Sequence, residues 1–507
     1  MIKIIIFLLK FEEGYLHMKK SSEMKKTILC LCVVGLVLLS FFACKQTASE
    51  DKKEQTQNTN ENAEEQNIAA DRSTLDDLGE YDYEGYEFRI LNWTSPAQAF
   101  LDGRMDFSEE TGDIYQYEIY RRNRRLEDRF NIEMKVIIYE GAGNAMIKNQ
   151  LLADGTEYDL YTAHMQIALS FATEGLINDI SNLEHIDLSK AYWDDFLNDQ
   201  LTIANLRYFA VGAFDFTAYD LCYALVVNKN LLQIYGLEDP FRLVKEGKWT
   251  MDKFAEMSKT AISDLNGDGK MTKDDACGYV ARSSDVMPGF WVGAGVKASE
   301  NDGDDIPQNM MGTEHFINVI DKIFDITWGQ ETYFNMFEFD MFIDGNVLFN
   351  DSSLHRLKYL RGMETDFGIL PYPKWNEAQE NYYSREAGSA MYFTPAGASK
   401  EDASRTSVVL EGMASDSYAS CLPAYYESVL KTKLARDEES AEIIDIICAN
   451  KVVDWVDTVW MSDFRDGSLD TMFKSKKNTL ASLNEKMTPQ YESKRDQMVE
   501  AFLALDK

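Results

Sequence analysis

The sequence predicts an α/β fold with two regions of mostly parallel β-sheet. Segments with the alternating polarity of strands are followed by segments with helical periodicity, and this alternation begins again near Cys222. Because parallel strands need a crossover connection, usually a helix, the alternation predicts parallel pairing. The chain has 507 residues, of which 45% are hydrophobic, so it can bury two sizeable cores rather than one.

The first region is expected to contain three strands, each followed by a helix. The first helix is rich in arginine, and Arg121, Arg122, Arg124 and Arg125 are expected on a solvated face that pairs with neighbouring acids. In chain order, the expected elements are strand 86–93, helix 113–130, strand 132–139, helix 145–153, strand 158–162 and helix 167–175.

The second region is expected to begin with a buried strand at 222–228. Thr250 is a suitable helix N-cap, and Trp249 before it is expected to pack against that helix as a staple. Helices are expected to dominate from about Ser404 to the C-terminus. The other expected elements are helix 229–235, a turn and short strand within 342–350, strands 367–370 and 390–393, and helix 440–460.

The charge balance argues against several partners. Asp and Glu number 85 against 51 Lys and Arg, which gives a net charge of -34. Such an acidic surface repels phosphate backbones and anionic lipid. We therefore expect neither nucleic-acid binding nor membrane contact through the body of the protein.

The N-terminus has the layout of a signal peptide over residues 1–43. An apolar run, TILCLCVVGLVLLSFFA, follows a basic cluster, and a polar, acidic stretch then predicts a disordered linker over 44–82. The start is open between Met1, Met18 and Met24. Phe41-Phe42-Ala43-Cys44 resembles a bacterial lipoprotein signal, which implies lipidation of Cys44 and an extracytoplasmic protein held at the cell membrane. An uncleaved N-terminal anchor is the alternative, because the run nearly suffices to span a bilayer.

One motif is specific for a metal. The segment DLNGDGKMTKDD, residues 264–275, repeats the spacing of an EF-hand calcium loop, with a glycine at the position of the sharp turn. An aspartate at the twelfth position, where a bidentate glutamate is usual, resembles dockerin-type loops. The alternative is a solvated acidic turn without metal. The predicted calcium ligands are the side chains of Asp264, Asn266, Asp268 and Asp275 and the carbonyl oxygen of Lys270.

Motifs for catalysis are mostly missing from the sequence. There is no H-E-x-x-H, G-x-S-x-G or Walker A pattern, and the histidines are scattered singly. A G-x-G-x-x-A match at 293–298 lacks the strand and helix that a dinucleotide site needs. Carboxylates are so numerous that no pair can be chosen as acid and base. We predict no catalytic residue.

Ordered landmarks give the chain a resemblance to extracellular solute-binding proteins of ABC importers, in the maltose-binding-protein-like carbohydrate branch. The landmarks are the strand ending at Asn92-Trp93, then IYQYEIYRRNRRLEDRFNI, YDLYTA, LRYFAVGAFDFTAYDLCYALVVNKNLL, GNVLFNDSS and DFGILPYPK. The resemblance covers roughly residues 83–507. It implies a monomer that binds a small solute, usually a sugar, and passes it to ABC permease subunits.

The resemblance implies a type II periplasmic-binding fold, in which two discontinuous lobes are joined by hinge strands. Lobe one would comprise 83–215 and about 392–428, and lobe two 222–385 and about 429–507. The chain would cross between lobes near 214–221 and near 386–391. Residues 208–213 are expected to form a strand of lobe one.

Candidate solute ligands are chosen at strand ends and crossings. A sugar has apolar C–H faces and a fringe of hydroxyls, so its site needs aromatic platforms and fixed polar groups. Trp93 could equally seal the core, and Trp455 and Trp460 are more simply packing residues. The candidate ligands are Trp93, Asp215, Tyr219, Trp291, Asp351, Arg385 and Tyr392.

Two other classes of function stay open at this point. Acidic pairs hidden in the cleft would suit a secreted glycan-active enzyme, and the N-terminal features would suit a surface adhesin or a sensory lipoprotein. Release of reducing ends from oligosaccharides would favour the enzyme. Neighbouring permease genes would speak against the adhesin or sensor.

Overall fold

The computed structural model describes residues 75–94, 104–109, 112–140, 144–153, 155–208 and 210–505. The predicted signal peptide, Cys44 and most of the linker lie outside these residues. Leu78 packs against the core, and Asp76, although within the predicted linker, is buried and pairs with Arg129 at 2.7 Å. The folded body therefore begins before residue 83, because a polar segment can dock through one ion pair.

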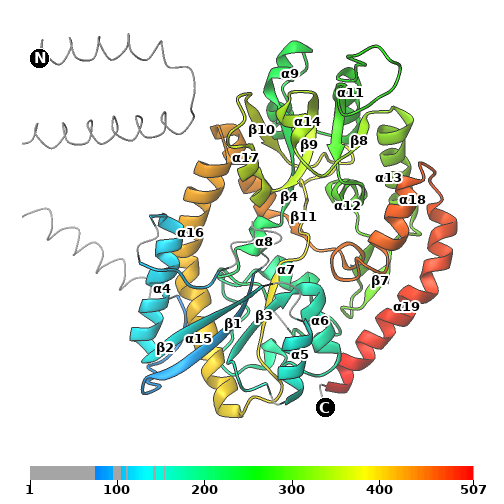
Figure 1. Ribbon diagram of the computed structural model, residues 1–507. Helices are drawn as coiled ribbons and strands as arrows, with labels where there is room; N and C mark the ends of the chain where they lie inside the picture. The colour runs from blue at the N-terminus through cyan, green and yellow to red at the C-terminus, as the bar shows by residue number, and fades with distance from the viewer. Residues whose placement is uncertain are drawn as a thin grey trace, which may run out of the picture. The chain divides into compact units, whose positions relative to one another are not determined.

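Lobe one is built on a four-stranded sheet with the order β12-β3-β1-β2 (Figure 1). β1 pairs in parallel with β2 and β3, and β12 is antiparallel to β3. Three expected strands and the later strand at 390–393 are confirmed. The bounds are β1 Tyr86–Thr94, β2 Ile132–Glu140, β3 Leu160–His164 and β12 Ala390–Phe393.

Helices cover both faces of this sheet. α4 and α15 pack on one face, and α5 and α6 pack on the other (Figure 1). α4 begins after its N-cap Asp113, within one residue of the expected start. Arg122, however, is not solvated: it is 1% exposed and donates to the Met105 carbonyl at 3.1 Å. The bounds are α4 Ile114–Phe130, α5 Asn144–Ala153, α6 Met165–Thr173, α7 Asp195–Gln200 and α15 Lys400–Ala419.

Lobe two contains a five-stranded mixed sheet with the order β10-β4-β9-β5-β8. β5 pairs in parallel with β9 and β8, whereas β4 is antiparallel to both of its neighbours, so the sheet is less parallel than expected. A separate hairpin, β6–β7, extends from this lobe. The bounds are β4 Tyr223–Asn228, β5 Cys277–Ala281, β6 Ser299–Asn301, β7 Pro307–Asn309, β8 Tyr333–Asn335, β9 Val347–Ser353 and β10 Phe367–Leu370.

The helices of lobe two surround this sheet. Thr250 caps α11 by accepting from the Lys253 amide at 3.4 Å, and Trp249 is fully buried, as expected. The bounds are α9 Lys229–Ile234, α10 Pro240–Lys245, α11 Met251–Thr260, α12 Ser283–Gly293, α13 Glu314–Phe324, α14 Asp340–Ile343, the 3-10 helix η4 Leu354–Leu360, α17 Glu438–Ala449 and α18 Asp470–Lys474.

Two sequence-based element predictions are wrong. The continuous helix at 440–460 is interrupted after α17, because β13 (Lys451–Val452) pairs with β11 (Ser384–Arg385) before a short π-helical turn, η6 (Trp455–Val459). Of the strand expected at 208–213, the described residues 208 and 210–213 form a single bridge, between Gly212 and Trp193. In both places long-range pairing decides the backbone conformation, and local periodicity cannot report it.

The chain passes between the two sheets at adjacent crossings. The first contains the short helix α8 (Thr217–Asp220), and the second contains Glu386, which forms an isolated bridge with Cys222. A third passage runs through α16 (Cys421–Tyr425) and the π-helical turn η5 (Tyr426–Leu434). The lobe bounds that the resemblance implies also require a passage at each of these three places, between 215 and 222, between 385 and 392, and between 428 and 429.

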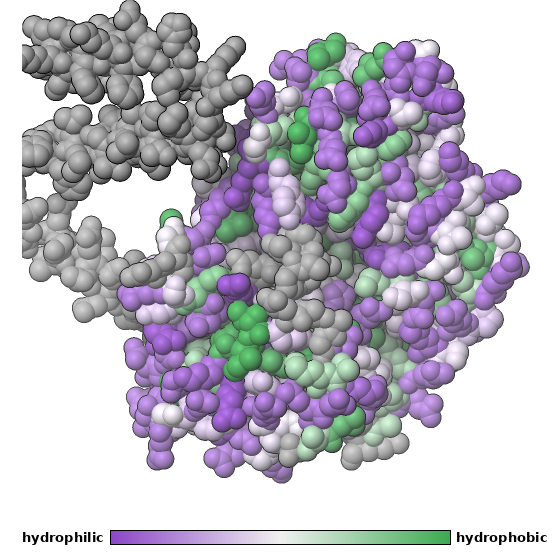
Figure 2. Space-filling model, viewed as in Figure 1, coloured by the Kyte–Doolittle hydropathy of each residue, from purple (hydrophilic) through white to green (hydrophobic). Residues whose placement is uncertain are grey.

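The last helix, α19 (Leu480–Leu505), contacts both lobes rather than lobe two alone. It packs against β7 and α13 in lobe two and against α6 in lobe one. Phe502 packs against Tyr208 of lobe one with ring centroids 4.5 Å apart and ring planes tilted by 43°. Hydrophilic side chains predominate on the face shown in Figure 2, in keeping with the net charge. Within the described part of the chain, every helix is too short or too polar to cross a lipid bilayer.

Candidate functional site

The carboxyl ends of the parallel strands of lobe one place two rings together. β1 ends at Trp93 and Thr94, and β3 ends at His164, whose ring meets Trp93 edge-on with centroids 5.8 Å apart. The Nδ1 atom of His164 accepts from the Gln166 amide and so caps α6. Burial, reinforced by Arg465, lowers the pKa of His164 to about 4, so this ring is neutral at pH 7.

Lobe two presents charged groups where β5 ends. Arg282 follows β5, and Asp285 lies in the first turn of α12. The Asp285 carboxylate accepts hydrogen bonds from Nε and Nη2 of Arg282 at 2.8 and 2.9 Å. Asp285 also accepts from Nη1 of Arg385, which comes from β11, at 2.8 Å. A strand end of lobe two is thus bound to the segment that leads into the second crossing.

Arg385 lies at the centre of this network. It is 1% exposed, and its guanidinium donates to Asp457 at 2.9 Å and lies over the ring of Tyr223 at 4.4 Å. Arg465 donates to the same Asp457 at 3.0 Å. We call Arg282, Asp285, Arg385, Asp457 and Arg465 the arginine–aspartate cluster. Its four buried members, Asp285, Arg385, Asp457 and Arg465, lose solvation, but each of them has charge-assisted hydrogen bonds to compensate.

Asp285 in the cluster and Asp351 near it have opposite protonation states. Burial opposes ionisation of Asp285, but Arg385 and Arg282 outweigh it and hold the pKa of Asp285 well below its usual value. In Asp351, on β9, burial and the charge of Asp285 raise the pKa to about 8, and Tyr372 donates to it at 3.0 Å. At pH 7 the site therefore combines an ionised acceptor with a neutral acid that can donate.

The structure brings together only some of the predicted ligands. Arg385 belongs to the cluster, Asp351 acts electrostatically on it, and Trp93 contacts His164 beside it. Trp291 lies at neither a strand end nor a crossing: it is within α12, is fully buried, and packs against Phe316 with centroids 5.5 Å apart.

The other three predicted ligands surround the crossings. Asp215 is fully buried in the first crossing. Tyr392, on β12, packs edge-on against Phe214 with centroids 4.7 Å apart. Tyr219 is half-buried under the Lys451 ammonium, 4.5 Å from the ring centroid. The contacts described for these three side chains are therefore with groups at or beside the crossings.

Sequence reasoning missed most of the cluster. Asp457 is the one carboxylate in WVDTVW, and a lone acid in so apolar a run signals a buried partner. Arg282 directly follows an apolar strand, which marks a strand end. His164, Asp285 and Arg465 have no distinctive local pattern.

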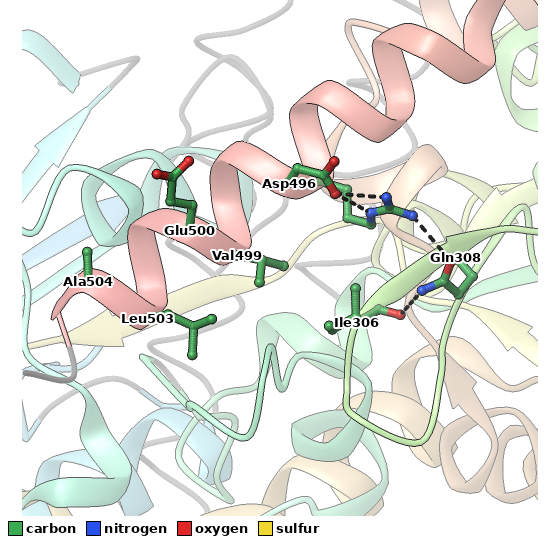
Figure 3. A pocket seen from close by; sticks show the side chains of 8 residues that line it. Ile306, Gln308, Asp496, Val499, Glu500, Leu503 and Ala504 are labelled. Carbon is green, nitrogen blue, oxygen red and sulfur yellow. Dashed lines mark hydrogen bonds and ion pairs between the residues drawn. The ribbon is translucent and has the colours of Figure 1, made fainter.

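Two cavities flank α19. One of about 440 Å³ lies between α6 and α19 and reaches Val459 and Trp460, just beyond Asp457. A larger one, of about 720 Å³, lies between the β6–β7 hairpin and α19 (Figure 3). In the larger cavity Arg495 donates to Gln308 at 3.2 Å, so its polar side chains pair with one another. No predicted solute ligand lines either cavity.

The predicted calcium loop lies between α11 and β5. Both of its glycines, Gly267 and Gly269, have φ of 75°, which turns the loop back on itself. Asp264 accepts from these two amides at 2.6 and 2.8 Å, and Asp275 accepts from Leu265 and Thr272 at 3.0 and 2.8 Å. In the described ranges, no three His, Cys, Asp or Glu side chains gather as a metal site. The oxygen donors are nonetheless of the type that calcium prefers.

Solved structures with the same fold are substrate-binding proteins. A cyclo/maltodextrin-binding protein complexed with maltotetraose aligns with a TM-score of 0.55 at 12% identity, covering 84% of this chain and 98% of that one. A sugar transporter from Rhizobium etli in an open conformation gives 0.53 at 13% identity, with coverage of 83% and 100%. UgpB from Mycobacterium tuberculosis in complex with glycerophosphocholine gives 0.51 at 16% identity, with coverage of 82% and 98%.

No protein-family model matches the sequence, and neither does any curated protein. At identities this low, the structural likeness establishes the fold and leaves the ligand open. The predicted fold class, two α/β lobes of the type II periplasmic-binding kind, is confirmed.

Proposed function

We propose that this protein captures a small solute, a sugar or oligosaccharide, between its two lobes and delivers it unchanged to an ABC permease. The observation that carries the proposal is the arginine–aspartate cluster, in which Arg385 bonds both Asp285 of lobe two and Asp457 beside the crossing. A buried polar network at the junction of two lobes is the kind of place where a solute is enclosed from both sides.

The chemistry of the neighbouring groups suits a polyhydroxylated solute. Arg282 offers a donor whose side chain is 43% exposed. Trp93 and Asp351 are only 9% and 5% exposed, and they would supply an aromatic ring and a group that can donate or accept. Hydroxyl groups need both donors and acceptors at fixed positions. Solved proteins of this fold bind maltotetraose and glycerophosphocholine, which supports a small polar solute. Binding would then shift the population of closed lobes, which a permease can recognise.

Location and partners form part of the same proposal. The N-terminal basic cluster and apolar run support export, and Cys44 would carry the lipid that holds the protein at the outer face of the cell membrane. The membrane would be contacted through this anchor alone. We propose a monomer that meets permease subunits when it is closed on its solute.

We also propose that the loop at 264–275 binds calcium as a structural clip. Asp264, Asn266, Asp268 and Asp275 would supply side-chain oxygens, and Lys270 a carbonyl. Binding would require Asp264 and Asp275 to exchange amide hydrogen bonds for the ion. Calcium would tie the end of α11 to the start of β5, far along the chain from Arg385.

The test is a thermal-shift screen against monosaccharides and oligosaccharides, followed by calorimetry and product analysis. A ligand that binds only the native state raises its stability by mass action, so a true solute raises the midpoint of unfolding. Saturable binding with the sugar recovered intact is expected. Release of reducing ends would overturn the proposal in favour of a glycan-active enzyme, and a panel without any binder would overturn the choice of solute class.

A further inference from the structure

Two acidic side chains are buried where the two crossings run side by side. Asp215 lies in the first crossing and Glu386 in the second, and both are 0% exposed. The crossings are joined by the bridge between Cys222 and Glu386 and by a hydrogen bond from the Ala387 amide to the Leu221 carbonyl at 3.2 Å. We call Asp215 and Glu386 the crossing carboxyl pair.

Each carboxyl group has one oxygen bonded and one without a partner. Oδ1 of Asp215 accepts from the Thr217 amide at 2.9 Å, and Oε1 of Glu386 accepts from the Gly388 amide at 3.0 Å. Oδ2 of Asp215 and Oε2 of Glu386 have no hydrogen-bond partner among the described residues. A buried carboxylate oxygen without a donor is costly, whereas a protonated oxygen avoids that cost.

Thr217 connects the pair to the sheet of lobe one. Its hydroxyl donates to Asp215 and accepts from the Ala390 amide of β12 at 2.9 Å. Thr458, next to the arginine–aspartate cluster, donates to the Glu386 carbonyl at 3.1 Å. Asp215 is therefore linked through Thr217 to β12 of lobe one, and Glu386 is linked through its carbonyl to Thr458.

The surroundings leave both acids short of positive charge. The positive charge of Lys451, on β13, lowers the pKa of both acids, but its ammonium is bound to Asp194 at 2.9 Å and to the Cys448 carbonyl at 2.8 Å. The other groups that face the pair are neutral at pH 7: Thr217, Cys222, Ser389 and Tyr392. Burial raises the pKa of Asp215 to about 7, and burial together with Asp215 raises the pKa of Glu386 to about 8.

We propose that the crossing carboxyl pair is a proton-dependent latch on the arrangement of the two lobes. With both groups protonated, the crossings pack as the structure shows. When both are ionised, two uncompensated negative charges repel one another in a fully buried site, and the arrangement is disfavoured. That the latch regulates solute binding rests on the proposed function. Its effect on the stability of the solute-free protein does not.

The direction of the pH effect follows from linkage. In the unfolded chain these groups ionise near pH 4, while in the folded protein they keep their protons to pH 7 or 8. Between these limits the folded state holds more protons, so stability decreases as pH rises, and the decrease ends above pH 8. Asp351 and Asp454 also have raised pKa values, and they add the same slope to every variant.

The experiment compares wild type with Glu386→Gln, Asp215→Asn and the exposed control Glu380→Gln, without solute, between pH 5.5 and 9. We expect the unfolding midpoint of wild type and control to fall with pH, and that of Glu386→Gln and Asp215→Asn to fall distinctly less. Infrared spectra at pH 6 should show less protonated-carboxyl absorption in each crossing variant. Parallel slopes in all four proteins, or unchanged infrared spectra, would overturn the latch.

A second measurement follows the bound solute, once the screen has identified one. We expect the dissociation constant of wild type to rise about tenfold from pH 6 to pH 9, which corresponds to one pKa unit of coupling, and that of Glu386→Gln to change much less. If Glu386→Gln does not fold, Asp215→Asn provides the same comparison. If the affinity of the variant and that of wild type depend equally on pH, the proposal that the latch regulates solute binding is overturned. Failure to find any sugar ligand would instead count against the proposed function, and the solute-free slopes would still decide the latch.

Discussion

The side-chain amide of Asn301, at the end of β6 in lobe two, donates to the backbone carbonyl of Thr202 in lobe one across 2.8 Å. The amide of Ala204 also donates to the Asp305 carbonyl in the same hairpin at 3.1 Å. Ala204, Asn205 and Asp305 have φ between 51° and 64° at this contact, a conformation that non-glycine residues rarely adopt. The hairpin therefore bonds one lobe to the other with a backbone that is held under strain.

Replacing Asn301 with alanine should weaken solute binding. The change removes one interlobe hydrogen bond, worth about 1 kcal/mol, from the arrangement that would enclose the solute. Calorimetry should show about a fivefold rise in the dissociation constant. Asn309→Ala is the matched control, because Asn309 bonds Asn484 of α19 at 2.9 Å rather than lobe one. Equal losses in the two variants would contradict an interlobe role for Asn301.

Arg385→Gln should destabilise the protein far more than an exposed arginine variant. Removing this guanidinium leaves Asp285 and Asp457 buried with fewer compensating charges, and breaking such a pair costs about 3–5 kcal/mol. Urea unfolding provides the measurement. Arg242→Gln is the control, since its side chain is 49% exposed and its ion pairs lie within one helical face, where about 0–1 kcal/mol is typical. Comparable losses would show that the cluster is not stabilising.

Asp351→Asn should flatten the pH dependence of stability. The folded protein keeps Asp351 protonated to about pH 8 because of burial and the charge of Asp285, whereas the unfolded chain releases this proton near pH 4. Stability from this group is therefore complete below pH 4 and decreases up to pH 8. The unfolding midpoint of the variant should fall less between pH 5 and 8 than that of wild type. The exposed Asp340→Asn should keep the wild-type slope, and identical slopes in all three proteins would refute the assignment.

Calcium should raise the unfolding midpoint if the loop at 264–275 binds it. At a concentration one hundred times the dissociation constant, a native-state ligand contributes about 2.7 kcal/mol. Scanning calorimetry with millimolar calcium or with a chelator tests this. Asp264→Asn should abolish the response, whereas Asp302→Asn should keep it, because Asp302 accepts loop amides at 2.9 and 3.1 Å in the β6–β7 hairpin instead. An unchanged midpoint in wild type would eliminate the clip.

Local sequence determined most elements of this protein. β1, α4, β4 and α11 lie where apolar periodicity and caps place them, because strand and helix periods and an N-cap such as Thr250 depend on neighbours in the chain. The crossings near 214–221 and 386–391 are placed by the resemblance to solute-binding proteins, not by local periodicity. The interruption after α17 could not be predicted locally, because it depends on the pairing of β13 with β11. The paired residues Lys451 and Ser384 are 67 residues apart in the chain.

The candidate site was decided by tertiary structure. The choice of strand ends and crossings selected Arg385, Asp351 and Trp93, but Arg385 meets Asp285 and Asp457 at separations of 100 and 72 residues. It also selected Trp291, which is core because α13 covers α12. Composition and periodicity record which residues prefer burial, while the partners that make a buried charge tolerable come from elements that meet only after folding. The same holds for Asp215 and Glu386, whose proximity depends on two crossings lying side by side.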